Sequence, residues 1–248
     1  PKPIYAHLPL ILAPDKSKLS GRHGAVSVTE YQKNGYLPQA LINYLALLGW
    51  NPGTEQEIFS IEELIQSFDV SKIQKAGAVF NIEKLNWFNK QYISKMSDVE
   101  CSVDAKDFIS KDMSNRVWPL IKEKISYFGE IEALLNGELS FVDGVGSYDK
   151  ESLKWKQEKD LINTKEYLKI IIEKLNSIDD FSKESVKAVL WPLAEEKGKG
   201  NILWPMRFAL SGKEKSPDPF IISEILGKQE TIKRLKFAHE LLYNIHIF

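Results

Sequence analysis

The chain has 248 residues, of which 43% are hydrophobic and 27% are charged, with a formal net charge of −1 at pH 7. These values are ordinary for a globular protein of one large or two smaller domains, and they exclude nucleic-acid binding through an overall positive charge. The only cysteine, Cys101, excludes an internal disulfide, and four scattered histidines give no metal motif. With neither a signal peptide nor a membrane-spanning run, we expect a cytoplasmic chain without a metal site.

The first expected elements are an extended segment at residues 4–12 and a cationic loop at 15–24. The segment alternates loosely with period two, and the loop carries three basic side chains and a histidine among small residues. Backbone amides beside small residues, together with Lys and Arg, suit a polyphosphate, whereas composition alone favours a solvated basic turn. Because the chain opens on Pro1 within an extended segment, we expect it to be a piece of a longer protein.

Helical signals dominate from residue 27 onward. Ser27 and Glu30 form a capping pattern for a helix that stops at Asn34-Gly35, and Pro38 fits the first turn of a helix that ends at Gly49. Further helices are predicted at 60–68 and 81–96 from a capping box, an Asn cap and apolar residues at helical spacing. The polar segment 97–116 marks a boundary between a domain at 1–97 and a domain at 98–248.

The second domain is also predicted to be helical. Helices are expected at 119–135, at 163–178 behind an Asn163 cap, at 182–197, from Pro205 to 212, at 219–227 and at 228–244. Gly198 and Gly200 are expected to end one helix, and Gly227 another. A glycine-bearing loop at 141–149 lies between two subdomains that we expect to divide near 147–163. The predicted fold class is mainly α, with packed helical bundles after a short extended segment.

Four stretches of sequence resemble one known family. SKLSGRHGAVSVTEYQKNGYLPQALINYLALLGWNPG, at 17–53, strongly resembles the signature-loop region of bacterial-type glutamyl-tRNA synthetases. That loop usually reads Lys-Leu-Ser-Lys-Arg-His-Gly in the family. FNIEKLNWFNKQYI at 80–93 resembles the family's next segment, and NILWPMRFALSG with PFIISEILGK, at 201–212 and 219–228, resembles its anticodon-binding part. The resemblance covers nearly the whole chain in the right order, but residues 98–200 match loosely.

The resemblance implies a signature loop and a stem-contacting helical domain, followed by an anticodon-binding domain. The chain would be the C-terminal part of a ligase that joins glutamate to tRNA with ATP. Lys18 and Arg22 would act in catalysis, because the loop stabilises the ATP phosphates while the glutamate carboxylate attacks. Ser20 and His23 would join them in binding ATP. Gly21 departs from the family, since a second lysine stands there in the usual signature.

The nucleotide-binding sheet of the family lies upstream of the signature loop and is not in this chain. The resemblance therefore predicts that the chain alone cannot activate glutamate. ATP with Mg2+ would be a substrate of the intact enzyme, and no cofactor is expected on this part. The substitution at Gly21 leaves two possibilities open: Lys16 or Arg22 compensates, or glutamate is activated poorly.

Candidate tRNA contacts combine cations with aromatic rings. Lys84 and Trp87 lie three residues apart on one helix, and the resemblance places them on the tRNA backbone. Anticodon bases are splayed, so their recognition needs stacking faces and hydrogen-bond donors. The other candidates are Arg116, Lys122 and Lys124 near Trp118, then Trp204, Arg207 and Arg234. The alternative reading is that Trp191 and Trp204 are core residues and that the cations are ordinary surface charges.

Three functional hypotheses follow. The first is the tRNA-binding part of a glutamate–tRNA ligase, with tRNA, glutamate and ATP as partners, no membrane and a monomeric, cytoplasmic state; an organelle stays open as an alternative. The second is a non-catalytic RNA-binding paralogue with a decayed signature loop. The third, a helical scaffold for proteins, fits less well with the specific match at 17–53.

Overall fold

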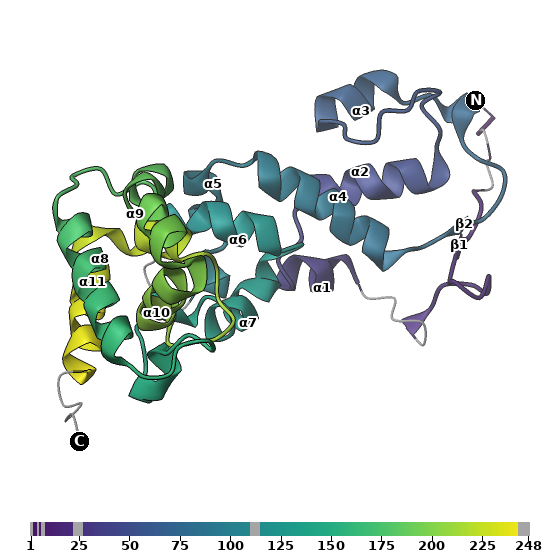
Figure 1. The fold of residues 1–248 in the computed structure, drawn as a ribbon. Coiled ribbons are helices and arrows are strands. Elements are labelled where there is room, and N and C mark those ends of the chain that lie inside the picture. Colours follow the sequence, from purple (N-terminus) through teal and green to yellow (C-terminus); the bar gives the residue numbers. More distant parts are fainter. Residues whose placement is uncertain (1, 4, 6–7, 22–26, 110–114, 243–248) are drawn as a thin grey trace. The chain divides into compact units, whose positions relative to one another are not determined.

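The computed structural model describes residues 2–3, 5, 8–21, 27–109 and 115–242. Across these residues the chain is mainly helical, as the sequence predicts. It divides between Glu132 and Ala133 into two units, each with its own core (Figure 1). The sequence-based boundary between 97 and 98 falls inside the first unit, and as a division between functional domains it stays a prediction.

The first unit combines short helices with two very short strands. Its elements are β1 (Ile11–Leu12), α1 (Val28–Lys33), α2 (Pro38–Gly49), α3 (Ile61–Ser67), β2 (Ala78–Val79), α4 (Ile82–Lys95), α5 (Asp98–Asp104) and α6 (Trp118–Lys124), with α7 (Ile131–Asn136) across the division. Ser27, Ser60 and Asn81 cap their helices as predicted, because each side-chain oxygen accepts a backbone amide of the first turn. β1 is shorter than the predicted segment 4–12, and it pairs in parallel with β2, which the sequence did not indicate.

In this unit one helix was not predicted and one predicted helix is wrong. The polar segment 97–116, which the sequence marks as a boundary, contains a helix that was not predicted: α5 begins with a complete capping box between Ser97 and Glu100. The single helix expected at 119–135 is divided into α6 and α7. Between them, the backbone N–H of Phe128 donates to the Gly35 carbonyl at 3.2 Å and that of Gly129 to Asn34 at 3.0 Å. These amides are bonded to a distant segment and therefore cannot continue α6.

Two adjacent clusters form part of the core of the first unit. The larger cluster joins α1, α2 and α4 through Tyr31, Tyr36, Leu41, Tyr44, Leu85 and Phe88. The smaller cluster joins the end of α2 to α3 through Trp50, Phe59 and Leu64. Buried Asn89 of α4 accepts from the Leu37 backbone N–H at 2.8 Å, and its amide donates to the Ser126 carbonyl. Such paired polar groups fix how α4 lies against its neighbours.

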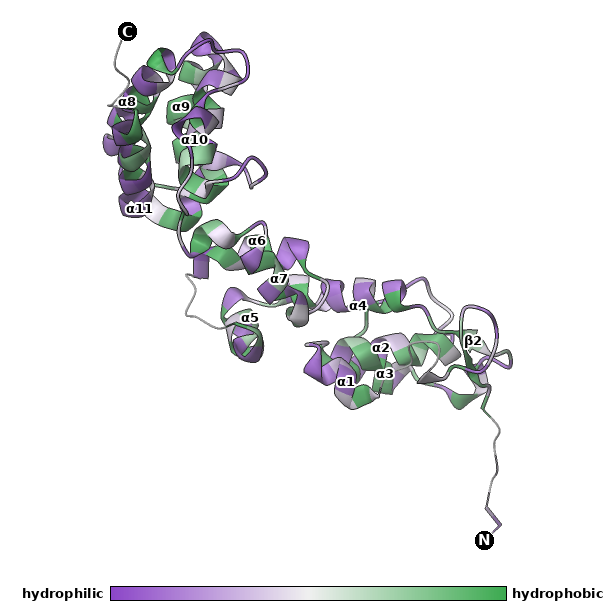
Figure 2. Ribbon diagram, turned by 90° about the horizontal axis from the view of Figure 1, so that it is seen from below, coloured by the Kyte–Doolittle hydropathy of each residue, from purple (hydrophilic) through white to green (hydrophobic). Residues whose placement is uncertain are grey.

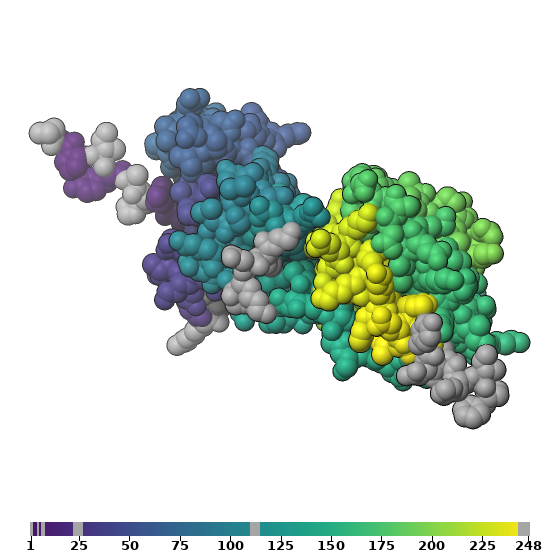
Figure 3. Space-filling view, turned by 90° about the vertical axis from the view of Figure 1, so that its left-hand side faces the viewer, coloured from purple at the N-terminus to yellow at the C-terminus, as the bar shows by residue number. Residues whose placement is uncertain are grey.

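The second unit is a bundle of four longer helices: α8 (Ile162–Asn176), α9 (Lys183–Lys197), α10 (Lys199–Ser211) and α11 (Pro219–Leu241). α10 packs against the other three, and α11 (yellow in Figure 3) lies against the green helices of this unit. Hydrophobic and hydrophilic residues alternate along α8 (Figure 2), which is typical of a helix with one buried face. Among the described residues, no helix is both long and apolar enough to cross a bilayer.

The helix ends and breaks at glycines in this unit were predicted in part. Gly198 ends α9 with φ of 96°, and Gly227 interrupts α11 with φ of 71°, as expected. Gly200 and Pro205, however, lie inside α10 rather than before it. The predicted Asn163 cap is also wrong, because α8 begins at Ile162, whose backbone N–H donates to the Asp160 carboxylate.

Candidate nucleic-acid interface

The first part of the cationic loop is a closed hairpin. The backbone N–H of Ala13 donates to the Ser17 carbonyl at 2.8 Å, and that of Leu19 donates to the Ile11 carbonyl at 3.0 Å. Asp15 accepts from both the backbone N–H and the hydroxyl of Ser17. Ala13 is fully buried at the base of the hairpin. The hairpin therefore holds the start of the loop in a fixed position on the first unit.

The predicted phosphate-binding residues follow this hairpin. The backbone of Lys18 bridges to Leu12, while its side chain is exposed, and Ser20 is half-buried. A Cβ added at Gly21 would meet no atom within 4 Å, and the backbone there is not in the left-handed region. Space for a longer side chain therefore exists at that position. Arg22 and His23 lie outside the described residues.

Lys84 and Trp87 share one face of α4, as their spacing predicts. The Lys84 ammonium lies 4.2 Å from the Trp87 ring centroid and 2.6 Å from a carboxylate oxygen of Glu57. Trp87 is 38% exposed and packs edge-to-face on Phe88. The indole is thus available to solvent, but a phosphate would have to compete with Glu57 for the lysine.

The basic cluster near α6 is only partly directed to solvent. Trp118 is 1% exposed, so its ring belongs to the core and offers no stacking face. Lys122 donates to the Met96 carbonyl at 3.0 Å and pairs with Asp98 at 2.7 Å, so its ammonium joins α6 to the start of α5. Arg116 and Lys124 carry exposed side chains.

Trp204 and Arg207 form an aromatic and cationic pair on α10. The Arg207 guanidinium lies 5.2 Å from the Trp204 ring centroid and also donates to the Glu214 carbonyl. Trp204 is half-buried, and its indole N–H donates to the Ser152 carbonyl at 3.0 Å. The guanidinium is therefore held over an indole face, which is an arrangement that stacks well on a base.

A second aromatic ring, which sequence reasoning missed, completes this surface. The ring centroids of Trp155 and Trp204 lie 5.4 Å apart. It reaches this position because Gly200 has no side chain: a Cβ there would lie 2.3 Å from the Trp155 ring. Nothing local in the sequence could reveal this, since the residues are far apart along the chain. We refer to Trp155, Trp204 and Arg207 as the α10 aromatic surface.

Arg234 is buried, unlike the other predicted contacts. It is 7% exposed, and one guanidinium nitrogen donates to the carbonyls of Phe141 and Leu210, each at 2.8 Å. Its Nε donates to Glu230 at 2.8 Å. Burial alone would raise the pKa of Glu230, but hydrogen bonds from Arg234 and Lys233 lower that pKa below its ordinary value. The burial favours a structural role for Arg234.

Another cationic and aromatic group occurs on α9. The ammonium of Lys187 lies 5.0 Å from the Trp191 ring centroid, and that of Lys199 lies 4.5 Å from it. The indole N–H donates to Glu195. Trp191 is half-buried rather than a core residue. Because its cations are ammonium groups, which lack the planar face of the Arg207 guanidinium, this group is less suited to stacking on a base than the α10 aromatic surface.

Redox and metal chemistry find no support among the described residues. Burial raises the pKa of the Cys101 thiol to about 11, so the thiol is protonated and inert at neutral pH. Within the described part of the chain, no group of three or more His, Cys, Asp or Glu side chains is placed to hold a metal ion. Binding through cations and aromatic rings is what this arrangement of side chains can offer.

Comparison with known proteins gives consistent matches along the chain. A family described as an anticodon binding domain matches residues 81–239, and one described as the catalytic domain of class I tRNA synthetases (E and Q) matches residues 1–87. The glutamate–tRNA ligase of Flavobacterium psychrophilum is 38% identical over 95% of this chain, and that of Prosthecochloris aestuarii is 36% identical over 94%.

Solved structures agree with these matches. The crystal structure of a glutamate tRNA ligase from Elizabethkingia meningosepticum, in complex with its amino acid, superposes with a TM-score of 0.76 at 33% identity. That superposition covers 96% of this chain and 52% of the other. The chain spans about half the length of the curated relatives it matches, 51% for the Flavobacterium psychrophilum protein.

Proposed function

Because the chain belongs to the glutamate–tRNA ligase family of class I synthetases, we propose that it is the tRNA-binding part of a ligase that joins glutamate to tRNA with ATP. The observation that carries this proposal is the α10 aromatic surface, which lies inside the segment matching an anticodon-binding domain. The relatives named above are all ligases, so the comparisons give no support to a non-catalytic paralogue. We further propose a monomeric, cytoplasmic protein.

The α10 aromatic surface would read anticodon bases. Trp204 is fixed by its bond to Ser152, so its face is pre-ordered, and Arg207 supplies a planar donor set beside it. Arg116, Lys124 and Lys84 would contact phosphates, which position the tRNA without reading its sequence. Lys122 and Arg234 are each held by bonds within their own unit, and they would stabilise that unit rather than contact the tRNA directly.

The signature loop would act on ATP. Lys18 projects from the anchored hairpin into solvent, where its ammonium would stabilise the charge that accumulates on the pyrophosphate. Ser20 would add a hydroxyl donor. The roles proposed for Arg22 and His23 in binding ATP rest on the family resemblance. ATP with Mg2+ would be a substrate of the intact enzyme.

The direct test is a titration of this chain with a glutamate tRNA transcript at about 50 mM and about 200 mM salt. We expect binding that weakens as salt rises, because Lys and Arg release counterions from the phosphates. A transcript with an exchanged anticodon should bind more weakly at both salt concentrations, because base contacts are lost. An absence of binding at the lower salt concentration would contradict the proposal.

Restoring the family's second signature lysine should increase glutamate activation. The test protein is a joined protein, in which the part of the Flavobacterium psychrophilum ligase that this chain does not match precedes residues 1–248. In that protein Gly21→Lys should raise the rate of ATP–pyrophosphate exchange by at least about tenfold, because one charge-assisted phosphate contact is worth roughly 1.5–3 kcal/mol. Gly21 has room for the side chain.

Gly146→Lys is the matched control for this substitution, since a Cβ at Gly146 also meets no atom within 4 Å. It should leave the exchange rate unchanged. The chain of residues 1–248 alone should give no exchange, with or without the lysine. An unchanged rate in the joined Gly21→Lys protein would mean that another cation already supplies the missing charge.

A further inference from the structure

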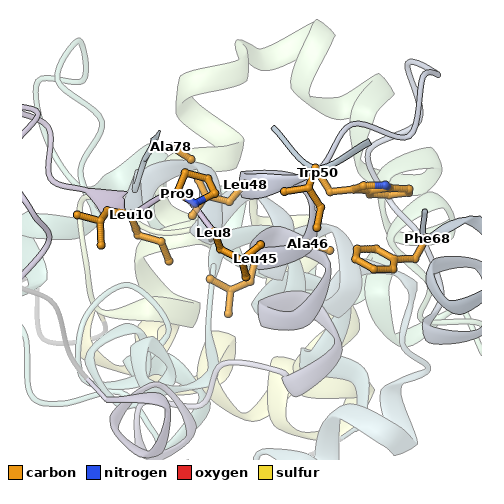
Figure 4. A pocket seen from close by; sticks show the side chains of 12 residues that line it. Leu8, Pro9, Leu10, Leu45, Ala46, Leu48, Trp50, Phe68 and Ala78 are labelled. Carbon is orange, nitrogen blue, oxygen red and sulfur yellow. The ribbon is translucent and has the colours of Figure 1, made fainter. Parts of the chain in front are cut away.

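The apolar pocket of the first unit, which Leu45 and Phe68 help to line (Figure 4), lies within the segment that matches the class I catalytic domain. It therefore belongs to a domain that is already identified. The second unit, in contrast, carries a cationic group that includes none of the contacts proposed above. It consists of Lys187 and Trp191 on α9 and Lys199 at the start of α10, and we refer to it as the α9 lysine–indole group.

Two ammonium groups from different helices converge on one ring in this group. Both lie within 5.0 Å of the Trp191 ring centroid, although the C-terminal part of α9 and the turn into α10 separate Lys187 from Lys199 in sequence. Like charges held at one place repel each other. An anion bound beside the ring would relieve that repulsion.

Neither ammonium group is neutralised within the described part of the chain. Lys187 and Lys199 have exposed side chains and no ion pair among the described residues. An aromatic ring attracts a cation through its quadrupole but carries no net charge. The ring thus holds both ammonium groups while their full charge stays available to a ligand. Several other lysines of this unit instead pair with carboxylates: Lys154 with Glu151, Lys197 with Glu196, Lys228 with Asp179 and Lys233 with Glu230.

The turn between α9 and α10 gives Lys199 a defined position. Gly198 adopts a φ of 96°, in the region that favours glycine, so that α10 begins directly where α9 ends and packs against it. The side-chain amide of Asn201 donates to the Lys197 carbonyl at 2.9 Å, and its backbone N–H donates to the Gly198 carbonyl at 3.1 Å. These bonds close the turn and fix the backbone from which Lys199 projects.

The indole of Trp191 is also held in place. Its N–H donates to Glu195 at 2.8 Å, and its ring centroid lies 6.5 Å from that of Phe220, which is buried on α11. Glu195 thus binds the edge of the ring, and within the described ranges it forms no ion pair with either lysine. Cations that are already positioned lose less conformational freedom on binding than freely moving lysines would.

We propose that the α9 lysine–indole group binds phosphates of the tRNA backbone. This inference rests on the proposed function. Ammonium groups suit phosphate as point charges, whereas a guanidinium such as that of Arg207 also offers a planar face. Lys199 lies on the same helix as Arg207, about 12 Å from it along the helix axis. A strand whose bases stack on the α10 aromatic surface therefore carries its phosphates close to this group, which positions the strand without reading its sequence.

Substitution of both lysines tests this contact. Lys187→Gln combined with Lys199→Gln should weaken binding of the glutamate tRNA transcript at least about tenfold at about 50 mM salt, because two cations are lost from the phosphates. The loss should be equal for the transcript with the exchanged anticodon. The slope of log affinity against log salt should fall by about one to two released counterions.

The matched control is Lys169→Gln combined with Lys236→Gln. It removes the same charge from exposed positions on α8 and α11, away from the indole. Its affinity should change by less than about twofold and its salt slope should stay that of the unchanged chain, since only the overall field is altered. Both double variants should keep the melting temperature of the chain.

A second measurement uses the unchanged chain and needs no substitution. Lysines are acetylated with a reactive ester, with and without the transcript, and the modified positions are identified by mass spectrometry. Acetylation should slow at Lys187 and Lys199 when the transcript is bound, and it should proceed unchanged at Lys169 and Lys236.

Equal acetylation of Lys187 and Lys199 with and without the transcript, or a double variant that binds like its control, would overturn the proposal. So would calorimetric binding of inorganic pyrophosphate that Lys187→Gln with Lys199→Gln abolishes while tRNA affinity stays unchanged, because the group would then take a free anion. In each of these outcomes the unchanged chain still binds tRNA. Failure of the proposed function would instead appear as no tRNA binding by the unchanged chain at the lower salt concentration.

Discussion

Arg234→Met is expected to lower the free energy of unfolding of the second unit by about 3 kcal/mol, since each charge-assisted hydrogen bond contributes roughly 1.5–3 kcal/mol. Arg234 donates to the carbonyls of Phe141 and Leu210 and to the carboxylate of Glu230. Leu210 lies in the last turn of α10, where carbonyls have no partner within the helix. Methionine keeps the apolar stem but leaves the Leu210 carbonyl without the guanidinium donor, whereas the Phe141 carbonyl keeps only the Gly144 backbone N–H at 3.2 Å. Urea denaturation followed by circular dichroism measures the change.

Two further variants distinguish a structural role of Arg234 from a role in tRNA binding. Lys233→Met removes the neighbouring cation, which is 77% exposed in the side chain and pairs with the same Glu230, and should cost less than about 0.5 kcal/mol. Arg234→Lys should rescue little, because an ammonium cannot reach two carbonyls and a carboxylate with the planar geometry of a guanidinium. If Arg234→Met kept full stability but lost tRNA affinity, Arg234 would be a phosphate contact instead.

Arg207→Ala is expected to weaken binding of the glutamate tRNA transcript about tenfold, which corresponds to about 1.4 kcal/mol. Its guanidinium lies against Trp204 at the centre of the α10 aromatic surface, so its removal takes away a stacking and donor group. The loss should be much smaller for the transcript with the exchanged anticodon, because that transcript does not make the base contact. The chain should therefore discriminate less between the two transcripts. Filter binding at fixed salt measures both affinities.

Lys124→Ala is the control for a contact without sequence preference. Lys124 is exposed on α6 and is proposed to bind phosphate. Its removal should weaken binding of both transcripts equally. The salt dependence of the affinity should fall by about one released counterion. If Arg207→Ala instead weakened both transcripts to the same degree, the α10 aromatic surface would be a backbone contact, and the anticodon would be read elsewhere.

Most helices of the first unit could be predicted because their signals are local. Ser27, Ser60 and Asn81 each accept backbone amides two or three residues further on, so the interaction lies within a few letters of sequence. Gly198 and Gly227 likewise mark breaks through their own backbone conformations. The signature loop and the stretches that carry the family resemblance are also contiguous in sequence.

The errors arose where distant segments decide the outcome. The helix predicted at 119–135 divides because Phe128 and Gly129 donate to carbonyls of the Asn34-Gly35 turn, almost a hundred residues earlier. Gly200 was expected to break a helix, yet it stays helical and lets Trp155 pack closely. Propensity is a weak preference that a tertiary hydrogen bond or a packed ring readily outweighs.

The sequence by itself determined the mainly helical class, the positions of most helix ends and the family to which the chain belongs, because caps, periodicity and contiguous motifs act over short distances. Only the tertiary structure decided which of the candidate cations face solvent. Arg207 and Arg234 are both arginines in predicted helices, and the sequence does not distinguish them. In the structure Arg207 lies over an indole, whereas Arg234 is buried and donates to two carbonyls. The reason is physical: exposure depends on which elements pack against a residue, and these come from segments far apart in the chain.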